Sequence, residues 1–165
     1  MDIKSELKIR VLPIFFLIAS SVALFGAIVL EYVLGFIPCQ ICIYQRWPYF
    51  LTVLFAIVML ARPKNFTLFF FLIIICLFFG VGLSVYHIGV ENGIFSASGI
   101  CSGSYDNVKS LDDLQKQIDS LQSLPSCDVA QKLFKIPISQ INLIYSLFIL
   151  VIGFMLKKIY GHKKD

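Results

Sequence analysis

Long apolar stretches alternate with short polar segments along this chain of 165 residues. Four of the stretches are nearly free of charge, and each is close to the roughly 20 residues that an α-helix needs to cross a bilayer. The pattern predicts an all-α integral membrane protein, a four-transmembrane-helix bundle in a single membrane domain over residues 1–165. The predicted helices cover residues 11–32, 43–61, 66–88 and 138–156.

The first apolar stretch follows three basic residues, Lys4, Lys8 and Arg10, as the core of a secretory signal peptide does. It is longer than a typical signal-peptide core, and no clear cleavage site of small residues follows it. We therefore expect the first stretch to be a retained transmembrane helix.

Proline and glycine residues predict local features of the bundle. Pro48 leaves the carbonyl of Tyr44 without its helical donor, so a kink is expected in the second helix. Residues 62–65 indicate a tight basic turn between the second and third helices. Gly80 and Gly82 predict close packing of the third helix against a neighbour.

Residues 89–137 form the long polar segment of the chain, a loop between the third and fourth helices. Apolar residues recur at helical spacing within it, and polar residues occupy the opposite face. We predict a short amphipathic helix over residues 108–121, which either lies on the bilayer surface or covers the bundle. Its apolar positions are Val108, Leu111, Leu114, Ile118 and Leu121.

The composition agrees with a membrane protein and argues against one class of partner. Hydrophobic residues make up 58% of the chain and charged residues 15%, and the mean hydropathy is +0.85. Soluble domains rarely exceed about half apolar residues. No basic stripe is interleaved with aromatic residues, so no nucleic-acid partner is expected.

The basic residues are distributed unevenly between the two sides of the predicted bundle. If successive helices alternate in direction, residues 1–10, 62–65 and 157–165 share one side, which holds nine of the 14 Lys and Arg residues. The 89–137 loop lies on the other side, with four lysines and six acidic residues. The positive-inside rule therefore places both termini in the cytoplasm and the loop outside it.

This topology puts four of the five cysteines on the oxidising side, where disulfides form. Two structural disulfides, a metal site and a redox relay are the alternatives. A Cys-x-x-Cys bridge constrains the unfolded chain little, whereas such pairs are widely used in thiol exchange. Only half of the paired spacing of a zinc site is present, so redox chemistry is favoured and no metal site is predicted. The four are Cys39, Cys42, Cys101 and Cys127, and Cys76 is interpreted as an apolar filler in the third helix.

Arg46 follows Cys42 by four positions and is expected on the same helix face. Cys42 is also near the predicted helix N-terminus, where the helix dipole favours an anion. Both effects lower the pKa of a thiol, so Cys42 is predicted to be a nucleophile, although a boundary Arg also extends to lipid headgroups. His87 and Glu91 lie one turn apart and are either a boundary pair without a role or a polar patch near a ligand.

Together these residues resemble the disulfide bond formation protein B (DsbB) family. The order of elements agrees as well, with the Cys-x-x-Cys pair before the second helix and a second pair between the third and fourth. The resemblance extends over essentially the whole chain. It rests on Cys39-x-x-Cys42-x-x-Gln45-Arg46-x-Pro48-Tyr49, on Tyr86-His87-x-Gly89-Val90-Glu91, and on Cys101 and Cys127.

The resemblance implies a bacterial inner-membrane enzyme that reoxidises a periplasmic DsbA-like thioredoxin-fold oxidase and passes the electrons to a quinone, either ubiquinone or menaquinone. By this analogy the reduced partner attacks a Cys101–Cys127 disulfide and forms a mixed disulfide with Cys101. Cys127 then attacks Cys39, and Cys42 is released as a thiolate that meets the quinone ring. The cofactor-binding residues that the resemblance implies are Cys42, Arg46, which holds a quinone oxygen, and His87.

Two other functions are considered. A vitamin K epoxide reductase-like enzyme also combines four helices, a Cys-x-x-Cys pair and a quinone, but its loop cysteines precede that pair, whereas here they follow it. A non-catalytic membrane protein stapled by disulfides would keep Cys39 and Cys42 oxidised while a soluble thiol partner turns over.

Overall fold

A computed structural model describes residues 3–96, 127, 130–133 and 135–160 of the chain. In this part, four helical stretches are long and apolar enough to cross a membrane, as the sequence predicts. Cys101 and the predicted 108–121 helix lie outside the described residues. The elements are α1 (Ile3–Tyr32), α2 (Gln40–Tyr44), α3 (Arg46–Ala61), η1 (Pro63–Asn65), α4 (Phe66–Glu91), β1 (Lys132–Leu133), β2 (Ile136–Pro137) and α6 (Ile138–Tyr160).

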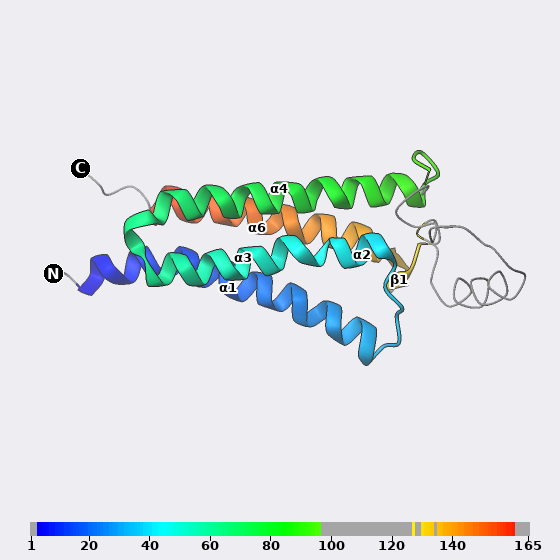
Figure 1. Cartoon of the computed structure of the whole chain (residues 1–165), viewed down its shortest axis with the longest axis horizontal. Coiled ribbons are helices and arrows are strands. Elements are labelled where there is room, and N and C mark those ends of the chain that lie inside the picture. The colour runs from blue at the N-terminus through cyan, green and yellow to red at the C-terminus, as the bar shows by residue number, and fades with distance from the viewer. Residues whose placement is uncertain (1–2, 97–126, 128–129, 134, 161–165) are drawn as a thin grey trace, which may run out of the picture.

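The long helices run roughly along one direction and form a bundle (Figure 1). The two chain ends and the α3–α4 turn lie at one end of this bundle, and α2 and the β1–β2 hairpin lie at the other. This arrangement confirms that successive helices run in opposite directions, as was assumed when the Lys and Arg residues were assigned to the two sides of the bundle. The turn itself is the short 3-10 helix η1, where a tight basic turn was predicted.

The helices extend beyond the apolar stretches that predicted them. α1 begins at Ile3, α4 continues to Glu91 and α6 to Tyr160. Hydropathy marks only the part of a helix that suits lipid, whereas backbone hydrogen bonds continue into polar flanks. The difference matters most in the second predicted helix, because α2 begins at Gln40, within the Cys-x-x-Cys motif.

The second predicted helix is divided at Gln45, which ends α2 and precedes α3, near the kink that Pro48 predicts. Pro48 has no N–H to donate to the carbonyl of Tyr44, so the regular ladder of hydrogen bonds is interrupted there. One turn later the hydroxyl of Thr52 donates to the carbonyl of Pro48 at 2.8 Å.

Glycine allows close helix contacts at two positions, of which the sequence predicted one. A Cβ at Gly80 would lie 3.3 Å from the Cβ of Pro48, so α4 and α3 approach closely there, as predicted. The prediction for Gly82 is wrong, because nothing lies within 4 Å of the Cβ position there. The second close contact joins α6 to α1, where a Cβ at Gly153 would lie 2.6 Å from the ring of Phe16.

The core of the bundle is apolar, with a polar layer between α3, α4 and α6. Tyr49 donates to Asn142 at 2.7 Å, and Asn142 donates to Ser84 at 2.9 Å. Hydrogen bonds of this kind hold membrane helices together where lipid offers no hydrophobic driving force. The buried apolar cluster around this layer includes Leu12, Phe16, Ala56, Met59, Phe70, Ile73, Leu77 and Ile149.

A small antiparallel hairpin precedes α6 and was not predicted from the sequence. Lys132 pairs with Pro137, and Lys135 has a positive φ of 73° at the turn. The side chain of Gln131 donates to the carbonyl of Ile37 at 2.7 Å. The hairpin is therefore tied to the connection between α1 and α2, directly beside the cysteine pair.

Candidate active site

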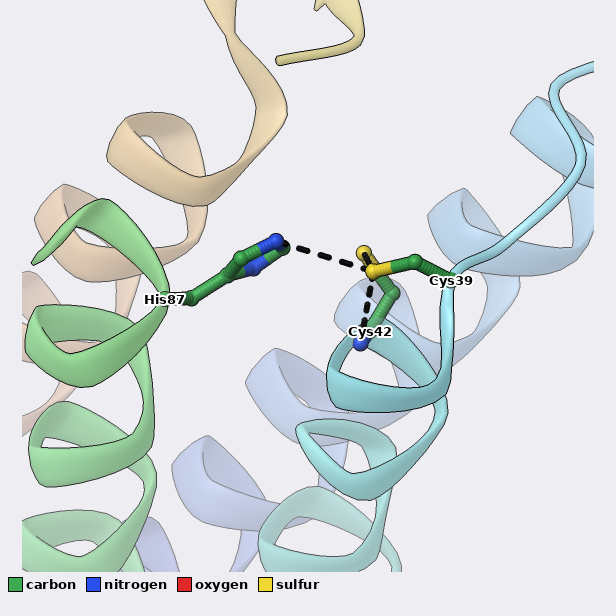
Figure 2. A group of neighbouring side chains, drawn as sticks. All are labelled: Cys39, Cys42 and His87. Atoms are coloured by element: carbon green, nitrogen blue, oxygen red, sulfur yellow. Dashed lines mark hydrogen bonds between the residues drawn. The ribbon is translucent and has the colours of Figure 1, made fainter. Parts of the chain in front are cut away.

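Cys39 and Cys42 lie at the first turn of α2 with their sulfur atoms 3.0 Å apart (Figure 2). Both are free thiols. Cys39 is the N-cap residue of α2, and its Sγ accepts a hydrogen bond from the backbone N–H of Cys42 at 3.4 Å. A disulfide has an S–S distance of about 2.05 Å. The two sulfurs thus need to approach by only about 1 Å to form one.

His87 comes from α4 and points its ring at the sulfur of Cys39 (Figure 2). Its Nε2 lies 3.6 Å from the Sγ of Cys39, and its Nδ1 lies 3.5 Å from the Nε2 of Gln45. Cys39, Gln45 and His87 are all buried. The ring is therefore held between α2 and the break before α3.

Glu91 extends this arrangement to α6. Its Oε1 lies 3.6 Å from the Nε2 of His87, and its Oε2 accepts a hydrogen bond from the hydroxyl of Ser139. Both partners of the His87–Glu91 contact have side chains at most 5% exposed. The polar chain Cys39–His87–Glu91–Ser139 thus links three helices.

Hydrogen bonds lower the pKa of Cys39 well below that of an ordinary thiol. The largest contribution is the Cys42 thiol, which donates to the sulfur of Cys39, and His87 adds to it. Burial acts in the opposite direction and is outweighed. The structure therefore assigns the stabilised thiolate to Cys39, at the helix N-terminus where an anion is favoured.

The sequence predicts this stabilisation at Cys42, with Arg46 as one of its causes. The structure differs on both points. Cys39, not Cys42, occupies the N-cap position, because α2 begins at Gln40. The guanidinium of Arg46 lies 2.7 Å from a carboxylate oxygen of Glu31 on α1, so its charge is already paired.

A mostly apolar pocket of about 280 Å³ opens beside Cys42, between α1, α3 and α6. Figure 1 shows α1 diverging from the other helices toward its C-terminal end, where the pocket lies. Cys42 and Arg46, two of the predicted cofactor-binding residues, line it, whereas His87 does not. The remaining lining includes Val22, Ala27, Leu30, Glu31, Tyr49, Ile141, Asn142 and Tyr145.

Cys127 packs with the cysteine pair and does not line the pocket. It is disulfide-bonded and fully buried, in one apolar cluster with Cys39, Ile41 and Val90. Its disulfide partner is none of the three free cysteines, Cys39, Cys42 and Cys76. Cys127 therefore packs in the same cluster as Cys39, although 88 positions separate the two residues.

The sequence reasoning missed Glu31, Gln131 and Ser139, each of which contacts or lines this region. One signal was present for Glu31. It is an acidic residue near the end of an apolar stretch, and ionisable residues in membrane segments usually face a partner or a cavity. Gln131 and Ser139 carry no comparable signal, because polar residues in a loop or at a helix end are ordinary.

Comparisons with known proteins support the family resemblance that the sequence motifs indicate. The profile of the family described as "Disulfide bond formation protein DsbB" matches residues 9–156. An uncharacterized protein of Rickettsia prowazekii (strain Madrid E) is 30% identical over 148 residues, which cover 87% of this chain and 85% of that protein. Disulfide bond formation protein B 1 of Pseudomonas fluorescens (strain Pf0-1) is 37% identical over 65 residues, 38% of each chain. No solved structure matches. With the family match covering all four membrane-spanning helices, this chain belongs to the DsbB family of membrane disulfide-bond-forming proteins.

Proposed function

We propose that this protein is a protein-disulfide:quinone oxidoreductase, which reoxidises a periplasmic DsbA-like oxidase and reduces a membrane quinone. One observation carries the proposal: the cysteine pair shares a buried cluster with Cys127, and Cys42 also lines a mostly apolar pocket between membrane-length helices. Electrons entering at Cys127 would thus leave through Cys42. Family membership supports disulfide chemistry at the membrane and weighs against the vitamin K epoxide reductase-like alternative.

Thiol exchange would deliver the electrons to the pair in balanced steps. The reduced partner's thiolate attacks a Cys101–Cys127 disulfide, forms a mixed disulfide with Cys101, and is released as a disulfide by its own second thiol. Cys127 then attacks Cys39 of an oxidised Cys39–Cys42 disulfide and displaces Cys42 as a thiolate. Attack of Cys101 on Cys127 restores the first disulfide and leaves Cys39 and Cys42 reduced. Two electrons have then moved from the partner to the pair.

The final step transfers these two electrons to the acceptor. The quinone supplies a two-electron sink, and the two thiols release two protons, so a dithiol and a quinone give a disulfide and a quinol. Cys42 is the sulfur that lines the pocket, and Arg46 offers a hydrogen-bond donor on the pocket wall. The sulfurs of Cys39 and Cys42, 3.0 Å apart, would join as the disulfide while the quinone takes up their two electrons and two protons.

The contacts of the pair support redox exchange over stapling. Cys39 has a histidine ring nitrogen 3.6 Å from its sulfur, a contact that suits a thiolate and that a structural staple does not need. The pocket walls suit an apolar ring and tail, since α1 contributes mainly aliphatic side chains. The cysteine end of the bundle would face the periplasm, with both termini in the cytoplasm and the bundle in the bacterial inner membrane.

The decisive experiment combines the purified protein in detergent with a reduced DsbA-like oxidase and a short-chain ubiquinone or menaquinone. Quinone reduction is followed by absorbance, and partner oxidation by thiol labelling. We expect Cys42→Ser to abolish quinone reduction and Cys76→Ser, the matched control in α4, to leave it unchanged. Quinone reduction at the wild-type rate in Cys42→Ser would overturn the proposal.

A further inference from the structure

We propose that the reduced Cys39–Cys42 pair, together with His87, binds one thiophilic divalent cation of the zinc type. The ligand atoms of the three residues, two Sγ and one imidazole nitrogen, all lie within 4.8 Å of one another. Thiolates and imidazole are the preferred ligands of Zn²⁺ and Cd²⁺. This site does not depend on quinone chemistry, only on the pair being reduced.

The spacing of the ligand atoms suits tetrahedral coordination. With Zn–S about 2.3 Å and Zn–N about 2.0 Å, sulfur and nitrogen ligands of one ion stand about 3.5 Å apart and two sulfurs about 3.8 Å apart. The Cys39 Sγ to His87 Nε2 distance is 3.6 Å. The two sulfurs, now 3.0 Å apart, would open by less than 1 Å. A side-chain rotation of Cys42, which is only half-buried, achieves this.

Glu91 lies beside the site but outside the three-residue group whose ligand atoms are within 4.8 Å of one another. Its Oε1 lies 3.6 Å from the Nε2 of His87, while Ser139 holds the other oxygen. Its carboxylate therefore adds negative charge next to the histidine ligand. Two thiolates and a carboxylate also give the site the negative charge that a dication requires. Arg46, the nearest basic residue along the chain, is paired with Glu31.

Binding requires defined proton changes at three groups. The ion displaces one proton from each thiol, and the Nε2 of His87 must be free of its proton, which then resides on Nδ1. Gln45 faces Nδ1, and its side-chain amide can turn to accept from an N–H or donate to a bare nitrogen. The ring can therefore change tautomer without losing its partner. No electrons move in this step.

The site exists only in one redox state, which gives it a regulatory consequence. A Cys39–Cys42 disulfide has no thiolates to offer, so oxidation removes two of the ligands. A bound ion in turn holds the thiolates and delays disulfide formation. The reduced protein would thus capture thiophilic metal, and bound metal would withhold electrons from any acceptor that uses Cys42.

The test titrates Cd²⁺ into the full-length protein in detergent, reduced and freed of reductant without oxygen. The readout is the ultraviolet thiolate-to-cadmium charge-transfer band together with metal content per chain. A background variant, Cys101→Ser with Cys127→Ser, removes the other outer thiols. In this background we expect one ion per reduced chain and none after oxidation of the pair.

Variants separate the proposed ligands from other groups. Cys39→Ser or Cys42→Ser should abolish the band, and His87→Gln should weaken Cd²⁺ binding by about tenfold or more. Cys76→Ser should change neither stoichiometry nor affinity. Equal binding to the oxidised and reduced background protein, or binding lost with Cys76→Ser and kept with Cys42→Ser, would overturn the proposal. Because the redox comparison uses one folded protein, it decides the question even if a substitution disturbs folding. If the unsubstituted protein binds Cd²⁺ in this way but does not reduce quinone, the proposed function is contradicted and the metal site is not.

Discussion

The Nε2 of His87 on α4 lies 3.6 Å from the Sγ of Cys39 at the start of α2, and both side chains are buried. This contact joins two segments that are 48 positions apart in the chain. It adds to the larger contribution of the Cys42 thiol in lowering the pKa of Cys39, the cysteine that does not line the pocket. The two cysteines of the pair therefore have different chemical environments, with Cys39 facing a histidine and Cys42 lining the pocket.

This difference predicts a pH profile for alkylation of Cys39. Because its pKa is depressed in the folded protein, Cys39 should remain thiolate, and react with iodoacetamide, at pH values well below those at which an ordinary thiol loses reactivity. Cys42→Ala removes the largest contribution and should shift the midpoint upward most, and His87→Gln should shift it upward by less. Mass spectrometry of alkylated Cys39 across pH checks this. A midpoint in Cys42→Ala equal to that of the native pair would contradict it.

The ion pair between Arg46 and Glu31 predicts how the pocket responds to substitution. Arg46→Gln should raise the apparent KM for quinone by about tenfold or more, because a charged hydrogen-bond donor is lost from the pocket wall, while thiol exchange with the soluble partner changes little. Steady-state kinetics with varied quinone, and separately with varied partner, measure the two effects. An unchanged quinone KM in Arg46→Gln would remove the role assigned to this residue.

Glu31→Gln tests the same ion pair from the other helix. It leaves Arg46 in place but unpaired, so the expected change in quinone KM is smaller than that for Arg46→Gln. The two substitutions should also be non-additive, because they affect one interaction. A double variant whose effect equals the sum of the two single effects would show that the residues act independently.

The glycines of α4 predict a position-specific effect on stability. Gly80→Leu should destabilise the bundle by about 1–3 kcal/mol, because a side chain there must displace Pro48 of α3. Gly82→Leu is the matched control, since its Cβ position meets nothing within 4 Å. Thermal unfolding in detergent, followed by the loss of helical circular dichroism, compares the two. Equal midpoints for both variants would contradict the packing assigned to Gly80.

The polar layer predicts a smaller effect at Tyr49. Tyr49→Phe removes a hydroxyl that contacts both Asn142 and Ser146 at 2.7 Å. Interhelical hydrogen bonds in membranes contribute about 0.6 to 1.7 kcal/mol, so the unfolding free energy should fall by about this amount. Tyr44→Phe is a suitable control, because the Tyr44 side chain is half exposed. An unchanged unfolding midpoint in Tyr49→Phe would indicate that water or Ser146 replaces the contact without loss.

The sequence by itself determined the four membrane-length helices and their alternating directions. Apolar runs of membrane length predict the four helices because the backbone must satisfy its own hydrogen bonds in lipid. Pro48 predicted a kink for a similarly local reason, namely the missing N–H, and the helix is interrupted nearby at Gln45. The Cys-x-x-Cys motif and its neighbours identified the family resemblance. Each of these signals can be read from one stretch of the chain or from a pattern that recurs along it.

Only the tertiary structure decided which groups face one another. Helical spacing suggested that Arg46 serves Cys42, yet Arg46 pairs with Glu31 of another helix, and no periodicity encodes that choice. The helix start was shifted from Ile43 to Gln40, which moved the N-cap and the anionic site to Cys39. Long-range packing alone brought His87 to Cys39 and Cys127 into the same buried cluster, because contacts across helices depend on their rotation and tilt. The cysteine pair was thus readable in the sequence, whereas the different roles of its two sulfurs were not.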